Sequence, residues 1–243
     1  MDKVIAIIFA GGSGHRMGAG RPKQFLEVSG RPIIIHTLDI FENHPRVDDI
    51  YIACKEDYID KLNKMIKRYD ISKVRKVVPG DSTGMGSIYN ALSAADSERS
   101  ADDIVLIHDG VRPCIDGALI DEVIGKVVET GAAVTCTPLF ETPIISKSGD
   151  IVEETPIRAE CYTAQAPQGF HLGEILKAHN TVRTNNPEYN GIIDNCTLMH
   201  SLGRKVSIIK GPRSNIKVTT PEDLYIFKAM MEYHETLDAL GVE

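Results

Sequence analysis

A glycine-rich loop with two nearby cations offers the first chemistry in this chain. Residues 10–14 read AGGSG, and Arg16 and Lys23 follow shortly after. Because glycine has no Cβ, such a backbone approaches a ligand closely and points several N–H groups at one anion. The two cations suit a triphosphate, whose charge shifts toward the leaving pyrophosphate when the α-phosphorus is attacked. We therefore predict a phosphate-binding loop.

Two common phosphate-binding motifs do not match this loop. No Gly-Lys-Ser/Thr sequence closes it, as a Walker A loop would require, and its glycines differ from the GxGxxG pattern of dinucleotide-binding enzymes. This argues against an ATPase and against a dehydrogenase. The alternative to a ligand site is a tight turn between a strand and a helix, with solvated charges.

Asp109 and Lys217 are further candidates. Asp109 follows an apolar strand predicted at residues 104–107, and open α/β sheets bind ligands at the carboxyl ends of their strands. Its carboxylate could hold Mg²⁺ against triphosphate oxygens, or it could be a helix cap or a loop residue. Lys217 stands between Ile216 and Val218, so strand alternation points it to the opposite face from both. It is either a phosphate cation or a solvated edge residue.

Short apolar segments alternate with longer amphipathic ones along most of the chain. This alternation is typical of parallel strands joined by crossover helices, and it predicts an α/β fold with a mostly parallel sheet. Apolar residues recur at helical spacing over 59–69 and 119–128, which predicts helices that cover the sheet. The predicted strands are 4–9, 50–53, 74–78, 104–107 and 132–137, followed later by helices at 172–182 and 192–202 and strands at 206–209 and 215–218.

The segment 138–168 interrupts this alternation. It consists of extended stretches punctuated by prolines, and the SGD sequence at 148–150 predicts a tight turn between two short strands. We expect a protruding β-arm within a single domain that spans residues 1–243. The last helix is predicted to begin at Pro221, because Thr220 suits an N-cap and acidic residues follow in the first turn.

Composition argues against several classes of protein. The formal charge of −7 and the scattered basic residues argue against a nucleic-acid partner. The five cysteines are odd in number and lack CxxC spacing, which indicates neither a disulfide framework nor a zinc site. The apolar run at 4–10 has seven residues, and no other segment is long enough to span a bilayer. We expect a soluble, cytoplasmic enzyme with no membrane partner.

Four ordered motifs carry a family resemblance. They are AGGSGHRMG with RPKQFLEVSGRPIIIHTL at residues 10–18 and 21–38, HDGVRP at 108–113, APQ with Phe170 at 166–170, and NIKVT before PED at 215–223. This set resembles the cytidylyltransferases that act on 2-C-methyl-D-erythritol 4-phosphate and on ribitol 5-phosphate, over nearly the whole chain. The resemblance implies a Rossmann-like three-layer αβα nucleotidyltransferase fold. It also implies Mg²⁺-dependent transfer of CMP from CTP to a small polyol phosphate.

The resemblance assigns roles to individual residues. Arg16, Lys23 and Lys217 are expected to be the catalytic cations, and Asp109 is expected to hold the metal ion and to contact the acceptor. Arg158 and Thr142 are expected to bind the acceptor from the arm of a partner subunit, which implies a homodimer. Asp194 is also expected on the acceptor side. The residues expected to bind the nucleotide are Ala10, Gly11, Gly12, Ser13, Gly14, Gly80, Asp81, Ser87 and Asp109.

No side chain is required as a general base. The attacking oxygen belongs to a phosphate monoester, which is already ionised at neutral pH, so positioning and charge stabilisation supply most of the rate. His15 and His108 are therefore interpreted as structural residues. Arg112 is also interpreted as structural, bonding carbonyl groups or the Asp109 carboxylate.

The chain departs from the family pattern near both expected substrates. On the nucleotide side, Gly84 stands where the family has an arginine and Asp81 where it has a second glycine. On the acceptor side, Ala166 and Ile193 replace threonines, which makes contacts to methylerythritol phosphate less secure and favours a ribitol 5-phosphate-like acceptor. The alternatives are the methylerythritol phosphate enzyme of isoprenoid synthesis, a CTP-binding regulator without catalysis, and a sugar 1-phosphate uridylyltransferase.

Overall fold

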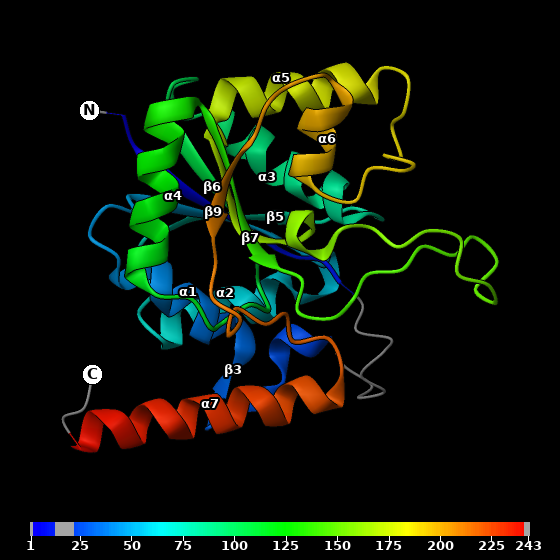
Figure 1. Cartoon of the computed structure of the whole chain (residues 1–243). Helices are drawn as coiled ribbons and strands as arrows, with labels where there is room; N and C mark the ends of the chain where they lie inside the picture. Colours follow the sequence, from blue (N-terminus) through cyan, green and yellow to red (C-terminus); the bar gives the residue numbers. More distant parts are fainter. Residues whose placement is uncertain (1, 13–21, 241–243) are drawn as a thin grey trace.

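A seven-stranded sheet forms the centre of the protein (Figure 1). The structure is a computed structural model, and it describes residues 2–12 and 22–240. The strands lie in the order β5-β4-β1-β6-β8-β7-β9. Their bounds are β1 Val4–Ala10, β4 Asp49–Cys54, β5 Val74–Pro79, β6 Ile104–Asp109, β7 Ala132–Pro138, β8 Tyr162–His171 and β9 Ser207–Lys210.

The sheet is mostly parallel, as predicted. Strand β1 pairs in parallel with β4 and β6, β4 with β5, and β7 with β9. Strand β8 runs antiparallel between β6 and β7. Strand β8 was not predicted from the sequence, because Pro167 and several polar residues break the apolar pattern of a buried strand.

Helices cover both faces of the sheet and complete the predicted three-layer αβα arrangement (Figure 1). Strand β1 shows why both faces are apolar. Ala6 and Ile8 pack on one face and Ile5 and Ile7 on the other, because successive side chains of a strand point in opposite directions. The first face is covered by α1 (Ile33–Asn43), α2 (Ile59–Arg68) and α4 (Gly117–Thr130), and the second by α3 (Gly84–Asp96), α5 (Leu172–Arg183) and α6 (Asn195–Ser201).

Helix α7 (Pro221–Leu240) lies apart from these layers, against the small hairpin of β2 (Glu27–Val28) and β3 (Arg31–Pro32) (Figure 1). It begins at Pro221 as predicted. Asp223 in its first turn accepts hydrogen bonds from the backbone N–H groups of Thr219 and Thr220 at 2.7 and 2.8 Å. Phe227 of α7 joins a small apolar cluster with Val218. This cluster anchors the segment that carries Lys217. Within the described residues, no helix is long and apolar enough to cross a bilayer.

Residues 215–218 do not form the predicted strand. Their backbone is committed elsewhere, since the Asn215 carbonyl accepts hydrogen bonds from the Arg112 and Gln165 side chains and Val218 donates to the Val111 carbonyl. Helix α6 is also shorter than predicted, because Asp194 caps it and it begins at Asn195.

The arm consists of residues 139–161 and extends from the body of the protein (Figure 1). The last part of the predicted arm, 162–168, belongs instead to β8 in the central sheet. The arm contains a single antiparallel bridge, Ile145 to Glu154, in place of two short strands, and Gly149 turns the chain with φ +85°. Six of its apolar side chains are exposed: Phe140, Ile144, Ile145, Ile151, Val152 and Ile157.

Close packing between β8 and α4 gives a first testable prediction. A Cβ added at Gly169 would lie 2.6 Å from Val127 Cγ2 and 2.7 Å from Val123 Cγ1, both in the core. We therefore expect Gly169→Ala to lower the free energy of unfolding by about 1–3 kcal/mol, through overpacking. Urea denaturation measures this. Gly125→Ala is the control, because a Cβ there meets nothing within 4 Å and alanine favours the helix. Equal stabilities of the two variants would contradict the packing argument.

Candidate active site

The predicted site residues come together at the carboxyl edge of the central sheet. Phe9 near the end of β1 pairs with Asp109 at the end of β6, so the glycine loop and the carboxylate leave neighbouring strands side by side. Strand β5 ends next to β4 at Pro79, and its connection leads directly into α3. This edge is where open α/β sheets bind ligands.

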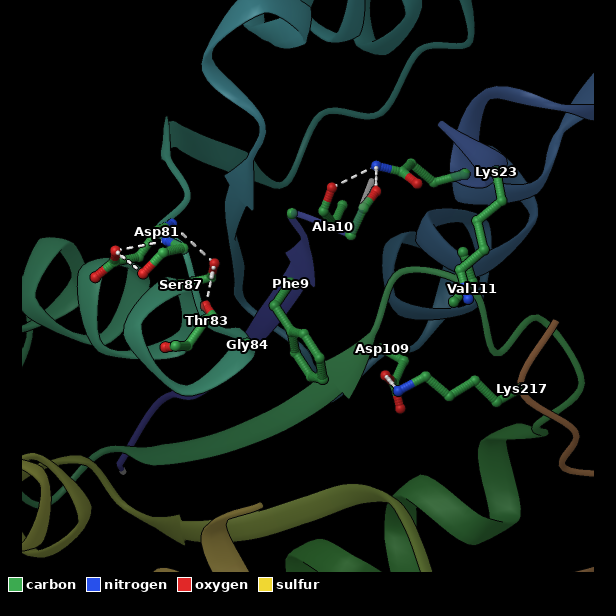
Figure 2. A pocket seen from close by; sticks show the side chains of 14 residues that line it. Phe9, Ala10, Lys23, Asp81, Thr83, Gly84, Ser87, Asp109, Val111 and Lys217 are labelled. Carbon is green, nitrogen blue, oxygen red and sulfur yellow. Dashed lines mark hydrogen bonds and ion pairs between the residues drawn. The ribbon is translucent and has the colours of Figure 1, made fainter. Parts of the chain in front are cut away.

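A cavity of about 350 Å³ opens between the glycine loop and the beginning of α3 (Figure 2). Eight of its lining residues were predicted from the sequence: Ala10, Gly11, Gly12, Lys23, Asp81, Ser87, Asp109 and Lys217. Gly80 lies behind them and donates its N–H to the Cys54 carbonyl at 2.7 Å. Three further predicted residues, Ser13, Gly14 and Arg16, lie outside the described residues.

Gln24 holds the first part of the glycine loop, residues 10–12, in place, and we did not predict this role from the sequence. Its Nε2 donates to the Ala10 carbonyl at 2.5 Å and to the Gly12 carbonyl at 3.3 Å. Gly11 packs closely against the first turn of α3, where an added Cβ would lie 2.9 Å from Ser87 Oγ. The missing Cβ therefore allows this close approach. The position of Gln24 directly after Lys23, within the RPKQF motif, was the available signal.

The N-terminus of α3 forms the opposite wall. Thr83 caps the helix by accepting a hydrogen bond from the Gly86 N–H, and Ser87 Oγ links the Asp81 N–H to the Thr83 carbonyl. The first helical N–H groups and the positive end of the helix dipole favour an anion near such a terminus. An anion placed in this cavity would meet both the helix terminus and the glycine loop.

Asp109, Arg112 and Lys217 form the charged centre of the site. Lys217 Nζ lies 2.5 Å from Asp109 Oδ1, and Arg112 Nε donates to Asp109 Oδ2 at 2.8 Å. Figure 2 shows the Lys217 and Asp109 side chains pointing toward each other. Burial raises the pKa of Asp109, but the charges of Lys217 and Arg112 outweigh this effect and lower the pKa to about 2. Asp109 is therefore ionised and holds Lys217 in position.

A second cavity, of about 590 Å³, adjoins the first between β8 and α6. The two cavities share Phe9, Gly84, Asp109 and Lys217, so the ion pair stands on their common wall. Asp194 lines the second cavity. Ala166 and Ile193, which stand where the family pattern has threonines, line it as well.

The predicted acceptor residues of the arm are not part of either cavity. Thr142 is exposed, and Arg158 Nη1 donates to the Phe140 carbonyl at 3.1 Å within the arm. Neither residue lines the cavities that contain Asp109. Within one chain, the structure therefore brings Asp194 to the charged centre but leaves Thr142 and Arg158 away from it.

A buried amide pair fixes the segment that carries Lys217. Asn215 is fully buried, donates to the Ala166 carbonyl at 2.7 Å, and accepts at its own carbonyl from Gln165 at 3.2 Å and from Arg112 at 2.8 Å. These bonds tie the segment to β8 and to the Asp109 loop. Asn215 belongs to the NIKVT motif, but no role was predicted for it from the sequence.

His108 has a structural role, as predicted. Its ring is fully buried against Phe41, and its Nε2 lies 3.0 Å from the Arg112 carbonyl. Burial lowers its pKa to about 4. The fully buried His179 behaves alike, since burial lowers its pKa to about 4 as well.

These two histidines give a second prediction, on pH. The unfolded chain protonates them near pH 6.5 but the folded chain only near pH 4, so stability is lost as the pH falls between these values. We expect a loss of roughly 2–3 kcal/mol for each histidine between pH 7 and 4.5, measured by urea unfolding. His108→Gln should flatten the dependence, whereas His200→Gln, at an exposed position, should not. Equal slopes for all three proteins would contradict the assignment.

The site fits a metal ion that is coordinated mainly by phosphate oxygens of a bound nucleotide and by water, with Asp109 as the protein ligand. Among the described residues, no cluster of three or more His, Cys, Asp or Glu side chains could hold a metal. Asp109 faces both cavities, and each of its oxygens keeps a lone pair beyond the bond to Arg112 or Lys217. One carboxylate suits Mg²⁺ that takes its other ligands from phosphates and water.

Comparison with known proteins agrees with this geometry. Residues 4–233 match the family model described as 2-C-methyl-D-erythritol 4-phosphate cytidylyltransferase. A ribitol-5-phosphate cytidylyltransferase of Streptococcus agalactiae is 41% identical over 98% of this chain and 99% of its own. A 2-C-methyl-D-erythritol 4-phosphate cytidylyltransferase of Syntrophotalea carbinolica is 36% identical, over 94% and 96%.

The fold also matches a solved structure. The 4-diphosphocytidyl-2C-methyl-D-erythritol synthase of Anaerococcus prevotii superposes with a TM-score of 0.82 at 30% identity, and the match covers 95% of this chain and 96% of that one. The agreement extends over nearly the full length of both chains. It supports the nucleotidyltransferase fold predicted from the sequence.

Proposed function

The chain belongs to the 2-C-methyl-D-erythritol 4-phosphate cytidylyltransferase family, and we propose that it transfers CMP from CTP to the phosphate of ribitol 5-phosphate. The chain is thus an enzyme of the nucleotidyltransferase class. One observation carries the proposal: two adjoining cavities share a wall that holds the Asp109–Lys217 ion pair. Such an arrangement lets two phosphate-bearing substrates meet at one cation.

CTP occupies the first cavity in this proposal. The glycine-loop N–H groups and the N-terminus of α3 hold the triphosphate, with Lys23 as an additional cation on the same wall. An oxygen of the acceptor phosphate attacks the α-phosphorus from the second cavity. As this P–O bond forms, the bond from the α-phosphorus to the bridging oxygen of the β-phosphate breaks, and pyrophosphate leaves with the electron pair.

Lys217 supplies charge where the two substrates meet. Its Nζ is held by Asp109 at the wall shared by both cavities, so it faces the reacting phosphates without having to reorganise. The acceptor phosphate is already ionised at neutral pH, so no side chain has to remove a proton. The protein contributes positioning and charge stabilisation.

Mg²⁺ is the proposed cofactor. Asp109 would hold it, together with phosphate oxygens of CTP and water, and the ion would neutralise charge on the triphosphate. The fit of the single carboxylate at the shared wall supports this assignment.

The second cavity favours ribitol 5-phosphate over methylerythritol phosphate. Ala166 and Ile193 line it where the family usually has threonines, so two hydroxyl contacts are replaced by apolar groups. The higher identity to the Streptococcus agalactiae ribitol-5-phosphate enzyme points the same way. Methylerythritol phosphate remains the alternative acceptor, supported by the family name.

We further propose that the enzyme is a homodimer that works in the cytoplasm. The arm exposes six apolar side chains and extends from the body, which suits an element that packs on a second copy (Figure 1). Arg158 and Thr142 lie away from their own chain's cavities, which supports a role for them in the site of a partner subunit. All five cysteines are unpaired, which fits a reducing compartment.

Pyrophosphate release tests the proposed reaction. Purified protein is incubated with CTP, Mg²⁺ and, in separate reactions, ribitol 5-phosphate, methylerythritol 4-phosphate and glycerol 3-phosphate. We expect the fastest release with ribitol 5-phosphate, little with UTP in place of CTP, and none after chelation of Mg²⁺. Tight CTP binding without turnover of any acceptor would instead support a regulator, and a preference for UTP would support a uridylyltransferase.

A further inference from the structure

A chain of buried polar side chains lies behind the second cavity. It runs from Tyr189, in the loop after α5, through His179 of α5 to Asn195 of α6. The Tyr189 hydroxyl lies 2.6 Å from His179 Nδ1, and His179 Nε2 lies 3.0 Å from Asn195 Oδ1. All three side chains are buried. Asn195 lines the second cavity, whereas Tyr189 and His179 do not.

The surroundings set the direction of these hydrogen bonds. His179 is neutral, because burial lowers its pKa to about 4, so one ring nitrogen donates and the other accepts. The Arg183 guanidinium stacks on Tyr89 and lies 5.8 Å from the Tyr189 ring centroid. Arg183 also interacts with the Tyr189 hydroxyl, and a cation offers only donors, so the hydroxyl hydrogen points away from Arg183 and toward His179 Nδ1. His179 Nε2–H then donates to Asn195 Oδ1.

This chain fixes the Asn195 amide in one orientation. Its Oδ1 is engaged by His179, so the NH₂ group is left for the cavity side. Among residues 2–12 and 22–240, no group accepts a hydrogen bond from Asn195 Nδ2. Asn195 is only 2% exposed and lines the second cavity, so its NH₂ group can donate to an acceptor atom placed in that cavity.

The neighbouring groups indicate what that acceptor is. Asp194 stands next to Asn195 on the same wall, and its carboxylate would repel an anion. The Gln168 NH₂ group is already used, since its Nε2 donates to Asp194 at 3.0 Å and to the Gln165 carbonyl at 3.3 Å. Its Oε1 is buried and has no partner among the described residues, and it could only accept from a donor such as a hydroxyl. A neutral oxygen therefore suits Asn195 Nδ2 better than a phosphate does.

We propose that Asn195 binds a hydroxyl group of the acceptor's polyol chain, and that His179 and Tyr189 are positioning residues that hold its amide toward the substrate. The inference rests on the proposed function and adds a specificity-determining residue to it. It also explains how the cavity recognises a polyol although Ala166 and Ile193 supply no hydroxyl. An acceptor too short to reach Asn195 lacks this hydrogen bond and is discriminated against.

Steady-state kinetics with CTP, ribitol 5-phosphate and the short acceptor glycerol 3-phosphate test this inference. We expect Asn195→Ala to raise KM for ribitol 5-phosphate about tenfold or more, equivalent to about 1.4 kcal/mol, and to leave KM for CTP within twofold. For glycerol 3-phosphate, kcat/KM should stay within twofold, so the variant loses discrimination. Asn195→Asp keeps the shape and the bond to His179 but lacks the donor, and it should also raise the ribitol 5-phosphate KM.

The positioning role has its own pair of variants. His179→Gln retains an N–H donor for Asn195 Oδ1, whereas His179→Leu does not. We expect His179→Leu to raise the KM for ribitol 5-phosphate at least fivefold, with KM for CTP unchanged, and His179→Gln to stay closer to the wild type. Thermal unfolding of each variant separates this effect from loss of fold.

Each outcome bears on a separate claim. If the wild type turns over ribitol 5-phosphate but Asn195→Ala and Asn195→Asp keep its KM within twofold, the present inference is wrong and the proposed function stands. If KM for CTP and KM for the acceptor rise together in every variant, Asn195 and His179 only support the fold, and the inference is again overturned. A wild type that is silent with every polyol phosphate contradicts the proposed function itself.

Discussion

Replacing Lys217 by methionine is expected to lower kcat/KM for CMP transfer by about 10³-fold, equivalent to about 4 kcal/mol. Methionine keeps an unbranched stem but removes the charge that Asp109 holds on the wall between the two cavities. Pyrophosphate release at several concentrations of CTP and ribitol 5-phosphate measures the effect. Because Asp109 keeps its bond to Arg112, the loss should come from catalysis more than from stability.

A matched lysine controls for this substitution. Lys210 is exposed at the end of β9 and lines neither cavity, so Lys210→Met should retain activity within twofold. If the Lys217→Met enzyme keeps more than a tenth of the wild-type kcat/KM, Lys217 does not take part in the reaction. In that case Lys217 would only balance the buried charge of Asp109.

The second large effect concerns the arm. Arg158→Ala is expected to lower kcat/KM for ribitol 5-phosphate by about 10²-fold or more, because an arginine that pairs with the acceptor phosphate is lost. In the proposed dimer, Arg158 of one subunit serves the site built around Lys217 of the other. The Arg158→Ala and Lys217→Met variants should therefore complement each other.

Mixed dimers make this prediction quantitative. A dimer of one Arg158→Ala and one Lys217→Met subunit contains one intact site, and random mixing in equal amounts makes half of the dimers hybrid. Activity should thus recover from near zero to about a quarter of the wild-type value after the two proteins are unfolded and refolded together. No recovery, with hybrid dimers shown to be present, would mean that the arm serves its own chain or no site.

The sheet could be predicted from sequence wherever strands are continuous apolar runs. Strands β1 and β6 are buried on both faces and contain almost only apolar residues, so their positions follow from composition. Strand β8 could not be found in this way. Gln165 and Gln168 are buried in it, where their NH₂ groups donate to Asn215 and Asp194, and these partners are distant in the sequence.

Local patterns were misleading where side chains take over backbone hydrogen bonds. Residues 215–218 alternate like a strand, yet Arg112 and Gln165 occupy the Asn215 carbonyl and no ladder forms. In contrast, the beginning of α7 was predicted correctly, because Pro221 and Asp223 act within one helical turn. Predictions that depend on neighbours in the chain were therefore more successful than those that depend on distant contacts.

In the candidate site, too, individual residues could be predicted from motifs, whereas contacts between residues distant in the sequence could not. Asp109 and Lys217 were both predicted as site residues, but their ion pair was not. The two residues are far apart in the sequence, so no local pattern indicates the contact. His179 and Asn195 carry no motif of their own, and only their hydrogen-bond partners in the folded protein show what they do. Gln24 lies within the RPKQF motif, but its contact with the glycine loop appears only in the folded protein. The arm residues Arg158 and Thr142 stay predictions, since a single chain does not bring them to the cavities.

An internal competition tests the central claim most directly. The enzyme is given CTP, Mg²⁺ and equal amounts of ribitol 5-phosphate and methylerythritol 4-phosphate in one reaction, and mass spectrometry follows the two cytidine diphosphate products at early times. Because both acceptors compete for the same site, the product ratio equals the ratio of their kcat/KM values. We predict that CDP-ribitol exceeds the methylerythritol product at least tenfold. A mixture dominated by the methylerythritol product would contradict the account.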